Sequence, residues 1–212
     1  MIKCPLCRDS AVADFHSDRK RDFKSCLSCQ MVFVPPEYHL SPYEERIRYN
    51  LHQNDAGDPG YRSFLERLYT PVRNSLRKGD RGLDFGSGPK PVLAHMFRED
   101  GFETDSYDPF FAENPTVFAR KYDFITASEV LEHLRDPGGE LERIFQILKP
   151  GGILGIMTEM LPDRSDFGSW YYKRDMTHIS FYSPPVFRWI ARNWNRSVEF
   201  PIAGVALFRR SA

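Results

Sequence analysis

Hydrophobic residues recur three and four positions apart in several stretches of this 212-residue chain. Such a stripe predicts an amphipathic helix that packs one face on a core. Four stretches share the spacing: residues 61–76, 92–97, 141–148 and 187–194. Near the end of the chain, apolar segments at 198–200 and 205–208 flank a turn with proline and glycine, and they predict a hairpin.

An apolar strand and a glycine turn precede the helix at 92–97, in the run Gly82-Leu83-Asp84-Phe85-Gly86-Ser87-Gly88. Gly86 and Gly88 let the backbone turn tightly and approach a ligand, while Asp84 ends up at the carboxyl edge of the sheet. The run predicts a site for a nucleotide-like cofactor, although a lone Gly-x-Gly is more often an ordinary turn. A dinucleotide fingerprint would need its third glycine at Pro91, which argues against NAD.

The composition indicates a soluble globular protein, with 41% hydrophobic and 27% charged residues. The 29 basic and 29 acidic side chains balance. This neutrality argues against attraction to bulk RNA or DNA, although Arg19-Lys20-Arg21 could form a local patch. No apolar run approaches the roughly 20 residues of a membrane span, and the N-terminus lacks a signal-peptide core. We therefore expect a cytoplasmic protein that does not bind membranes.

The four cysteines all lie in the first 29 residues, as the pairs Cys4-Pro-Leu-Cys7 and Cys26-Leu-Ser-Cys29. Two such knuckles are typical of a zinc site, and four thiolates complete a tetrahedral Zn²⁺ without an open position. We therefore predict a structural zinc, which so short a segment would need in order to fold. Disulfides or free thiols are the alternatives, and a reducing compartment disfavours disulfides.

These patterns divide the chain into a zinc ribbon at 1–35, a helical linker or cap at 36–80 and a core at 81–212. Within the linker, polar and aromatic residues gather at 48–55. They would lie over an active site as a lid, or form a solvated helix end before the turn at 58–60.

The core resembles the class I S-adenosylmethionine-dependent methyltransferases, whose first motif Asp84, Gly86 and Gly88 match. The third glycine of that motif falls at Lys90, a departure from the family pattern. Three further segments resemble the family in its own order: residues 102–108 its second strand, 122–133 its fourth strand and the loop over the cofactor, and 148–158, with Lys-Pro-Gly-Gly, its fifth strand.

This resemblance implies an α/β fold, a Rossmann-like, mostly parallel seven-stranded sheet with an antiparallel last strand and helices on both faces. It implies that S-adenosylmethionine binds at Asp84, Gly86, Ser87, Gly88, Asp108, Pro109, Ser128 and Glu129. Asp108 ends the second strand, where a carboxylate can accept both ribose hydroxyls. Only 13 residues separate Asp108 from Tyr122, so we expect a brief strand or loop around 116–118 to form the adenine wall.

Methyl transfer requires an oriented nucleophile and, where the nucleophile carries a proton, a base. Glu129, Glu132 and His133 follow the fourth strand, near the expected place of the methyl group. They are candidates for that base, or they open a helix and make surface contacts.

A second cluster of titratable and aromatic residues lies at 170–182. Its His-x-Ser-aromatic phrase resembles zinc-bearing sugar C-methyltransferases, in which the histidine acts as catalytic base, and small zinc modules precede the core in some of those enzymes. His178 is the matching position, and its pKa suits the role. Asp175 or Tyr182 would orient it. A core histidine bonded to the backbone is the alternative.

The sequence thus predicts a methyltransferase that uses S-adenosylmethionine, with a structural zinc and a small-molecule or sugar acceptor. Two other functions share parts of the pattern. One is an NAD(P)-binding Rossmann oxidoreductase, and the other is a zinc-ribbon adaptor with a catalytically silent methyltransferase domain.

Overall fold

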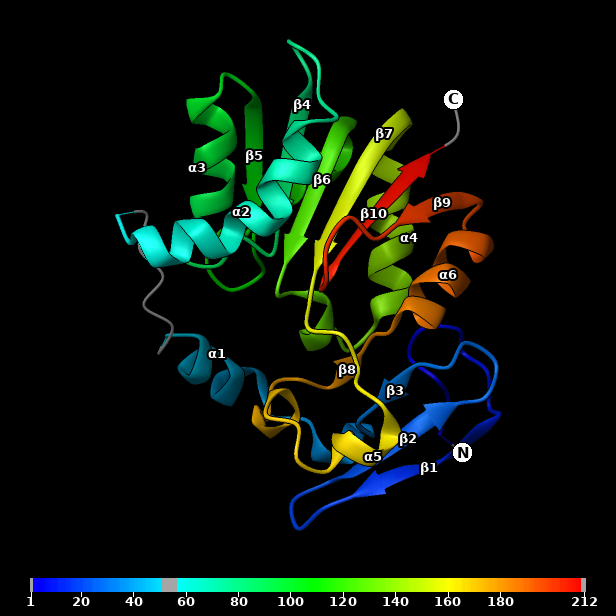
Figure 1. Cartoon of the computed structure of the whole chain (residues 1–212). Helices are drawn as coiled ribbons and strands as arrows, with labels where there is room; N and C mark the ends of the chain where they lie inside the picture. Colours follow the sequence, from blue (N-terminus) through cyan, green and yellow to red (C-terminus); the bar gives the residue numbers. More distant parts are fainter. Residues whose placement is uncertain (1, 51–56, 211–212) are drawn as a thin grey trace.

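The computed structural model describes residues 2–50 and 57–210, and its larger sheet has the strand order β5-β4-β6-β7-β10-β9 (Figure 1). Four strands run parallel: β4 (Arg81–Phe85), β5 (Glu103–Tyr107), β6 (Tyr122–Ser128) and β7 (Leu148–Met157). β10 (Val205–Arg210) pairs antiparallel with β7, and β9 (Arg196–Glu199) pairs antiparallel with β10. The predicted closing hairpin and the mostly parallel sheet are confirmed.

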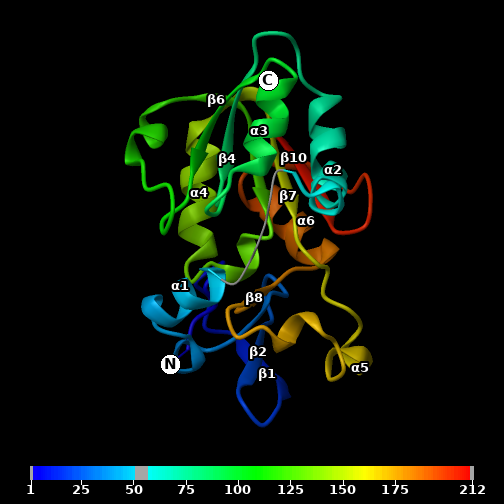
Figure 2. The ribbon, with the colours of Figure 1, turned by 90° about the vertical axis from the view of Figure 1, so that its left-hand side faces the viewer.

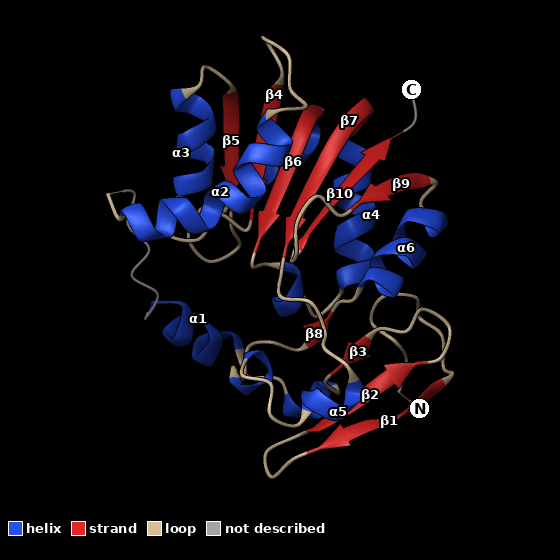
Figure 3. Cartoon of the chain, viewed as in Figure 1, coloured by secondary structure: helices blue, strands red, loops and turns tan. Residues whose placement is uncertain are grey.

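Helices cover both faces of this sheet because successive strand residues point to opposite sides. Phe124 and Leu207 pack under α2 (Pro59–Arg73) and α3 (Val92–Glu99). Their chain neighbours Ile125 and Phe208 point the other way, into the core formed with α4 (Pro137–Ile147) and α6 (Pro184–Asn193). Figure 3 shows the resulting three layers. The sheet is thus buried on both faces, so its polar groups can meet a ligand only at the ends of the strands.

The larger sheet has six strands within the described residues, not the seven that were predicted. Between Asp108 and Tyr122 the chain forms the 3₁₀ helix η2 (Pro115–Ala119) in place of a strand. A crossover between parallel strands needs a dozen or more residues, so 13 residues cannot supply a third strand and its two connections. Asn114 starts η2 instead, because its side-chain oxygen accepts from the Thr116 amide at 3.2 Å.

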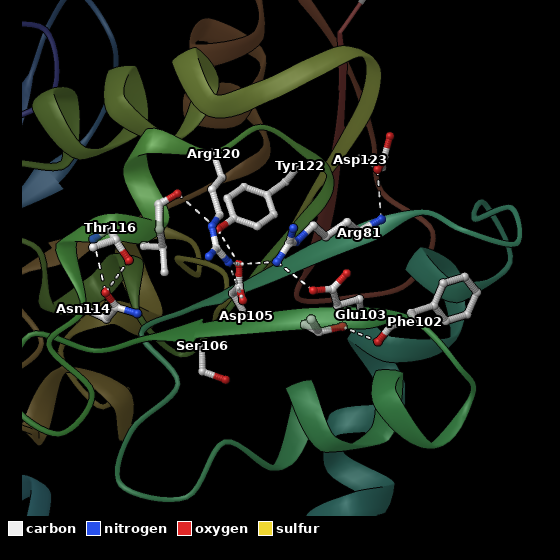
Figure 4. Close-up of polar contacts among 12 residues, drawn as sticks. Arg81, Phe102, Glu103, Asp105, Ser106, Asn114, Thr116, Arg120, Tyr122 and Asp123 are labelled. Carbon is white, nitrogen blue, oxygen red and sulfur yellow. Dashed lines mark hydrogen bonds and ion pairs between the residues drawn. The ribbon is translucent and has the colours of Figure 1, made fainter.

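A polar cluster joins the outer strand β5 to β4 and to the start of β6 (Figure 4). Asp105 accepts from the Tyr122 hydroxyl at 2.8 Å and pairs with Arg120 at 3.0 Å and Arg81 at 3.5 Å. These contacts join the outer strand β5 to its inner neighbours.

A smaller four-stranded sheet has the order β1-β2-β3-β8. Its strands are β1 (Val12–Ser17), β2 (Asp22–Cys26), β3 (Val32–Phe33) and β8 (Ser180–Phe181). Figures 1 and 2 place this sheet beyond the carboxyl ends of β6 and β7. Because β8 comes from late in the chain, the N-terminal segment is joined directly to the residues after His178. Two short helices, α5 (Arg164–Phe167) and η4 (Tyr172–Arg174), add Phe167 and Tyr172 to its aromatic core.

Two further helices connect the sheets, η1 (Pro36–Tyr38) and α1 (Pro42–Asn50). Asp58 caps α2 by accepting from the Gly60 amide at 2.8 Å. Of the predicted lid at 48–55, positions 51–55 lie outside the described residues. Within residues 2–50 and 57–210, none of the helices combines the length and apolarity that a membrane span requires.

Candidate active site

The turn after β4 is shaped by two glycines with positive φ, Gly86 at 74° and Gly88 at 65°. A Cβ on Gly86 would lie 2.4 Å from Cγ2 of Val130, so this position accepts no larger residue without a shift. The amides of Gly86 and Ser87 donate to the carbonyl of Tyr107 at 2.8 and 3.0 Å. This ties the turn to the end of β5, beside Asp108.

Asp84 lies beneath the turn and is almost completely buried. It accepts from the Thr126 hydroxyl at 3.1 Å and from the Ala94 amide at 3.3 Å. Burial raises its pKa to about 6, although both hydrogen bonds act to lower it. Asp84 is absent from the described cavity lining, so its contacts favour positioning the strand, turn and helix over touching a cofactor.

Asp108 follows β5, and its carboxylate holds the neighbouring loops together. One oxygen accepts from the Gly88 amide at 2.9 Å, and the other accepts from the amides of Phe110 and Phe111 at 2.8 and 3.1 Å. These three bonds fix the carboxylate at the end of β5, beside the glycine turn.

A cavity of about 820 Å³ opens where β4, β5 and β6 end. Its floor is the glycine turn. Tyr49 of α1 lies against Phe110 and His133, with ring centroids 5.4 and 5.3 Å apart, so α1 closes one side. Asp84 and Glu132 are buried away from the lining. The other predicted cofactor and catalytic residues line this cavity: Gly86, Ser87, Gly88, Asp108, Pro109, Ser128, Glu129, His133, Asp175 and His178.

The aromatic part of the lining differs from the prediction. The segment at 116–118 was expected to form an adenine wall, but Val117 is buried in the core below the sheet. Tyr107, Phe110 and Phe111 line the cavity instead. The aromatic pair directly after Asp108-Pro109 was the available signal, because a turn there returns both rings to the end of β5.

Two carboxyl groups meet on the hydroxyl of Tyr172. The Tyr172 oxygen lies 3.0 Å from Glu129, and it also bonds to Glu132 of η3 (Leu131–His133). Burial raises the pKa of Glu129 to about 7 and that of Glu132 to about 8, where the charge of Glu129 adds to the effect. Burial raises the pKa of Tyr172 as well. Protons are therefore held within this group near neutral pH.

His133 and His178 stand side by side, with ring centroids 4.8 Å apart. Nδ1 of His133 lies 3.1 Å from the carbonyl of Thr177, and Nδ1 of His178 lies 2.8 Å from the carbonyl of Tyr172. The Tyr172 carbonyl thus orients His178 at Nδ1. Asp175 or Tyr182 was expected in that role, but Asp175 bonds to Thr177 and Arg48, and Tyr182 donates to the Leu131 carbonyl at 3.2 Å.

Asp175 faces the same cavity and anchors its loop. It accepts from the amide and hydroxyl of Thr177 at 3.0 and 2.8 Å and pairs with Arg48 of α1 at 2.9 Å. Burial alone would raise the Asp175 pKa, but these donors outweigh it and hold the pKa below its ordinary value.

Arg21, from the turn between β1 and β2, supports this loop from behind. Its buried guanidinium donates to the carbonyls of Asp175 at 2.9 Å, His178 at 3.0 Å and Met176 at 3.3 Å, and also to that of Lys173. Sequence reasoning placed Arg21 in a surface patch. No local pattern identifies a partner more than 150 positions away.

The four cysteines converge as predicted. Sγ of Cys4 lies 3.5 Å from that of Cys29, and Sγ of Cys7 lies 3.4 Å from that of Cys26. All four sulfurs lie within 4.8 Å of one another, and no cysteine is in a disulfide. Zinc–sulfur bonds of about 2.3 Å place tetrahedral sulfurs about 3.8 Å apart, so the arrangement fits a closed four-thiolate ion.

Comparisons with known proteins return methyltransferases. A ubiquinone biosynthesis O-methyltransferase from Escherichia coli is 35% identical over 71 residues, which is 34% of this chain and only 30% of that protein. The Burkholderia thailandensis 1,6-didemethyltoxoflavin-N1-methyltransferase, solved with 1,6-didemethyltoxoflavin and S-adenosylhomocysteine, superposes with a TM-score of 0.59 at 16% identity. This match covers 94% of this chain and 99% of that one.

A SAM-dependent methyltransferase from Archaeoglobus fulgidus superposes with a TM-score of 0.51 at 15% identity, covering 72% of this chain and all of that one. At such identities the structural matches establish the fold alone. The family model described as a methyltransferase domain matches residues 58–198, well over half of the sequence. The glycine turn, the acidic strand end and most of the cavity lining fall within that range, whereas Pro42, Glu45 and Tyr49 of α1 precede it. The chain therefore belongs to this family of methyltransferase domains.

Proposed function

We propose that this protein transfers a methyl group from S-adenosylmethionine to a small-molecule or sugar acceptor. The observation that carries the proposal is the single cavity in which a glycine turn, an acidic strand end and an imidazole pair meet. Its volume of about 820 Å³ lies within the range of small-molecule sites. The family match favours methyl transfer over the oxidoreductase alternative.

The residues around the turn suit the cofactor. The backbone of Gly86, Ser87 and Gly88 can approach its amino acid moiety closely because side chains are small or missing there. In this proposal Asp108 binds the ribose, and Pro109, Phe110 and Phe111 contact the base. Ser128 and Glu129, which line the same cavity, complete the cofactor site. S-adenosylmethionine, when bound, supplies an electrophilic methyl group on a sulfonium sulfur.

The acceptor is proposed to lie against the wall formed by Glu129, His133, Asp175 and His178. Together the four residues are proposed to hold the acceptor in line with the methyl group. One of them takes up the acceptor's proton, and His178 is the first candidate for this base. Its Nδ1 is fixed by the Tyr172 carbonyl, so Nε2 is the basic nitrogen of the neutral ring. The Arg48–Asp175 pair keeps α1 beside this wall.

The four cysteines are proposed to hold a structural Zn²⁺. A closed four-thiolate site offers no position for substrate, so its contribution is to fold the N-terminal module. Cysteines that bind zinc and form no disulfide suit a reducing compartment, so we propose the cytoplasm as the location. The neutral net charge supports a small acceptor over bulk nucleic acid.

Ligand-induced stabilisation tests the proposal. S-adenosylhomocysteine at 100 times its dissociation constant should raise the free energy of unfolding by about 2.7 kcal/mol, and NAD should not. Stabilisation by NAD alone, or by neither ligand, would reject it.

An acceptor screen then tests turnover with a matched pair of variants. His178→Asn should keep the response to S-adenosylhomocysteine and lose turnover, whereas His95→Asn, an exposed change on α3, should keep both. Unchanged turnover in His178→Asn would remove this residue from the mechanism. A bound cofactor without turnover on any acceptor would favour the silent-domain adaptor.

A further inference from the structure

Three side chains of metal-ligating type meet beside the cavity, as a group separate from the four cysteines. Glu132 and His133 belong to η3, and His178 belongs to the loop before β8. One ligand atom of each lies within 4.8 Å of those of the other two. The Ile179 amide donates to the Glu132 carbonyl at 2.8 Å and fixes the two segments to each other. The convergence is therefore built into the backbone.

The hydrogen bonds of the two imidazoles define their tautomers. A carbonyl oxygen can only accept, so Nδ1 of His133 and Nδ1 of His178 must each carry the hydrogen that they donate to it. In the neutral rings, the lone pair is then on Nε2. A backbone carbonyl on the second nitrogen is the usual way in which proteins orient a metal-binding histidine.

The Glu132 carboxylate is completely buried. One oxygen accepts from the Tyr172 hydroxyl, while Oε2 has no hydrogen-bond partner among the described residues. A buried carboxylate oxygen without a partner is costly, and native proteins rarely leave one unless an ion or water completes it. This oxygen is the second, independent sign of a ligand.

We infer that Glu132, His133 and His178 bind a divalent first-row metal cation, of the Mn²⁺ or Fe²⁺ type, at the wall of the cavity. One carboxylate with two imidazoles on one side of an ion is a set that such cations accept, with positions open on the other side. His133 and His178 line the cavity, so the open side faces the acceptor. Glu129, joined to Glu132 through Tyr172, offers a further oxygen nearby.

The role of this cation rests on the proposed methyl transfer. It would select acceptors that present a hydroxyl oxygen, and it would make that hydroxyl more acidic. The acceptor proton leaves to water, the oxygen lone pair forms the bond to the methyl carbon, and the carbon–sulfur bond breaks with its electron pair remaining on sulfur. With the cation bound, His178 would serve as its ligand, and this role would replace the base role proposed above.

Mn²⁺ binding to the zinc-loaded full chain tests the inference, because thiolates favour zinc and do not compete for Mn²⁺. The electron paramagnetic resonance signal of unbound Mn²⁺ should report one saturable site per chain. Glu132→Gln and His178→Asn should each weaken binding about tenfold or more. His95→Asn, the exposed control, should bind as the wild type does.

Stabilisation by S-adenosylhomocysteine, measured in parallel, reports whether each variant is folded. The absence of saturable Mn²⁺ binding to the wild type, or equal affinity in a folded His178→Asn protein, overturns the cation site. These outcomes are separate from a failure of the proposed function. Mn²⁺ binding without any response to S-adenosylhomocysteine would leave the cation site standing and reject methyl transfer.

Discussion

Gly86 and Gly88 share a positive φ but differ in what surrounds them. A Cβ on Gly86 meets Val130, whereas a Cβ on Gly88 meets nothing within 4 Å. Both alanine variants therefore carry the backbone cost of about 1 kcal/mol, and only Gly86→Ala adds a steric clash. We expect Gly86→Ala to lower the free energy of unfolding by about 2–3 kcal/mol and to weaken S-adenosylhomocysteine binding strongly.

Urea unfolding and calorimetric titration of the two variants check this expectation. Gly79→Ala is the control outside the site, since Gly79 also has a positive φ, 94°, and open space around it. Equal losses in Gly79→Ala and Gly86→Ala would contradict the importance of the Val130 contact.

Asp84 gives a pH dependence with a defined sign. Its pKa is raised by burial from an ordinary value near 4 to about 6, so the folded state holds a proton that the unfolded state has released. The free energy of unfolding should therefore fall as pH rises from about 4 to about 6, by on the order of 2–3 kcal/mol. Asp84→Asn stays neutral and should remove this part of the slope.

The measurement is urea unfolding of the wild type and Asp84→Asn near pH 4 and pH 7. The variant should gain stability relative to the wild type at the higher pH. Asp163→Asn, an exposed control, should show no such change. A difference between Asp84→Asn and the wild type that is the same at both pH values would contradict the raised pKa.

The sequence identified residues with strong local signatures and missed those defined by distant neighbours. Gly86, Asp108 and His178 were predicted because turn chemistry and motif order mark them. The role of Asp84 beneath the turn depends on Thr126, 42 positions away, which no local pattern reveals. The aromatic lining from Phe110 and Phe111 was missed for a related reason, since a short turn decides where the rings point.

At the scale of elements, long periodic segments were predictable and short ones were not. The helices and the closing hairpin follow from apolar spacing. β8 has only two residues, and its pairing with β3 depends on contacts between positions nearly 150 apart. The strand expected between Asp108 and Tyr122 does not form, because the 13 residues between them are too few for a strand and two connections. This limit could already be read from the sequence.

Arg21 lets the smaller sheet control the His178 loop. It is buried, and it donates to four backbone carbonyls between Lys173 and His178. A shorter side chain would leave these carbonyls without donors and let the loop shift, and small displacements of positioned groups reduce rates by about a hundredfold. We expect Arg21→Ala to bind S-adenosylhomocysteine normally and to lose turnover by at least about tenfold.

Turnover and S-adenosylhomocysteine affinity, measured together, separate this loop effect from general unfolding. Arg21→Lys should recover part of the rate, since an ammonium can still donate to some of the carbonyls. Arg164→Ala removes an exposed contact with the same sheet, to the carbonyl of Phe15, and should change neither quantity. Full turnover in Arg21→Ala would mean that the loop holds its shape through β8 alone.

At the scale of the whole molecule, the cysteine module packs on the core in one hydrophobic cluster with residues of α4 and α6, and two further contacts concern the site. Its first knuckle sits on the start of α4, where a Cβ on Gly138 would lie 2.4 Å from the carbonyl of Leu6. Its sheet holds β8 and, through Arg21, the His178 loop. The glycine turn and Asp108 follow strands of the core sheet, and among the described residues their hydrogen bonds join them to one another and to the neighbouring loops. Folding of the module should therefore matter for the His178 loop, where the acceptor is proposed to bind. It should matter much less for the glycine turn, where the cofactor is proposed to bind.

Loss of the proposed zinc should separate these two functions. In Cys29→Ser the ion loses one of four thiolates, and the segment cannot bury enough surface to fold without it. We expect less than one zinc per chain by metal analysis, a lower melting temperature, and loss of turnover with S-adenosylhomocysteine affinity largely kept. Ser28→Ala, in the same knuckle, is the control and should keep zinc and activity, since Ser28 bonds only to Asp9 at the surface.

The pattern of losses in Cys29→Ser decides how the two parts cooperate. Lost turnover with retained cofactor binding means that the module acts by holding β8 and the His178 loop, because these are its links to the cavity wall. Loss of both turnover and cofactor binding means that the core sheet itself depends on the knuckle at α4, so that the glycine turn loses its shape when the knuckle unfolds. Retention of both would show that β8 and Arg21 hold the loop without a folded metal site, which contradicts the role proposed for zinc.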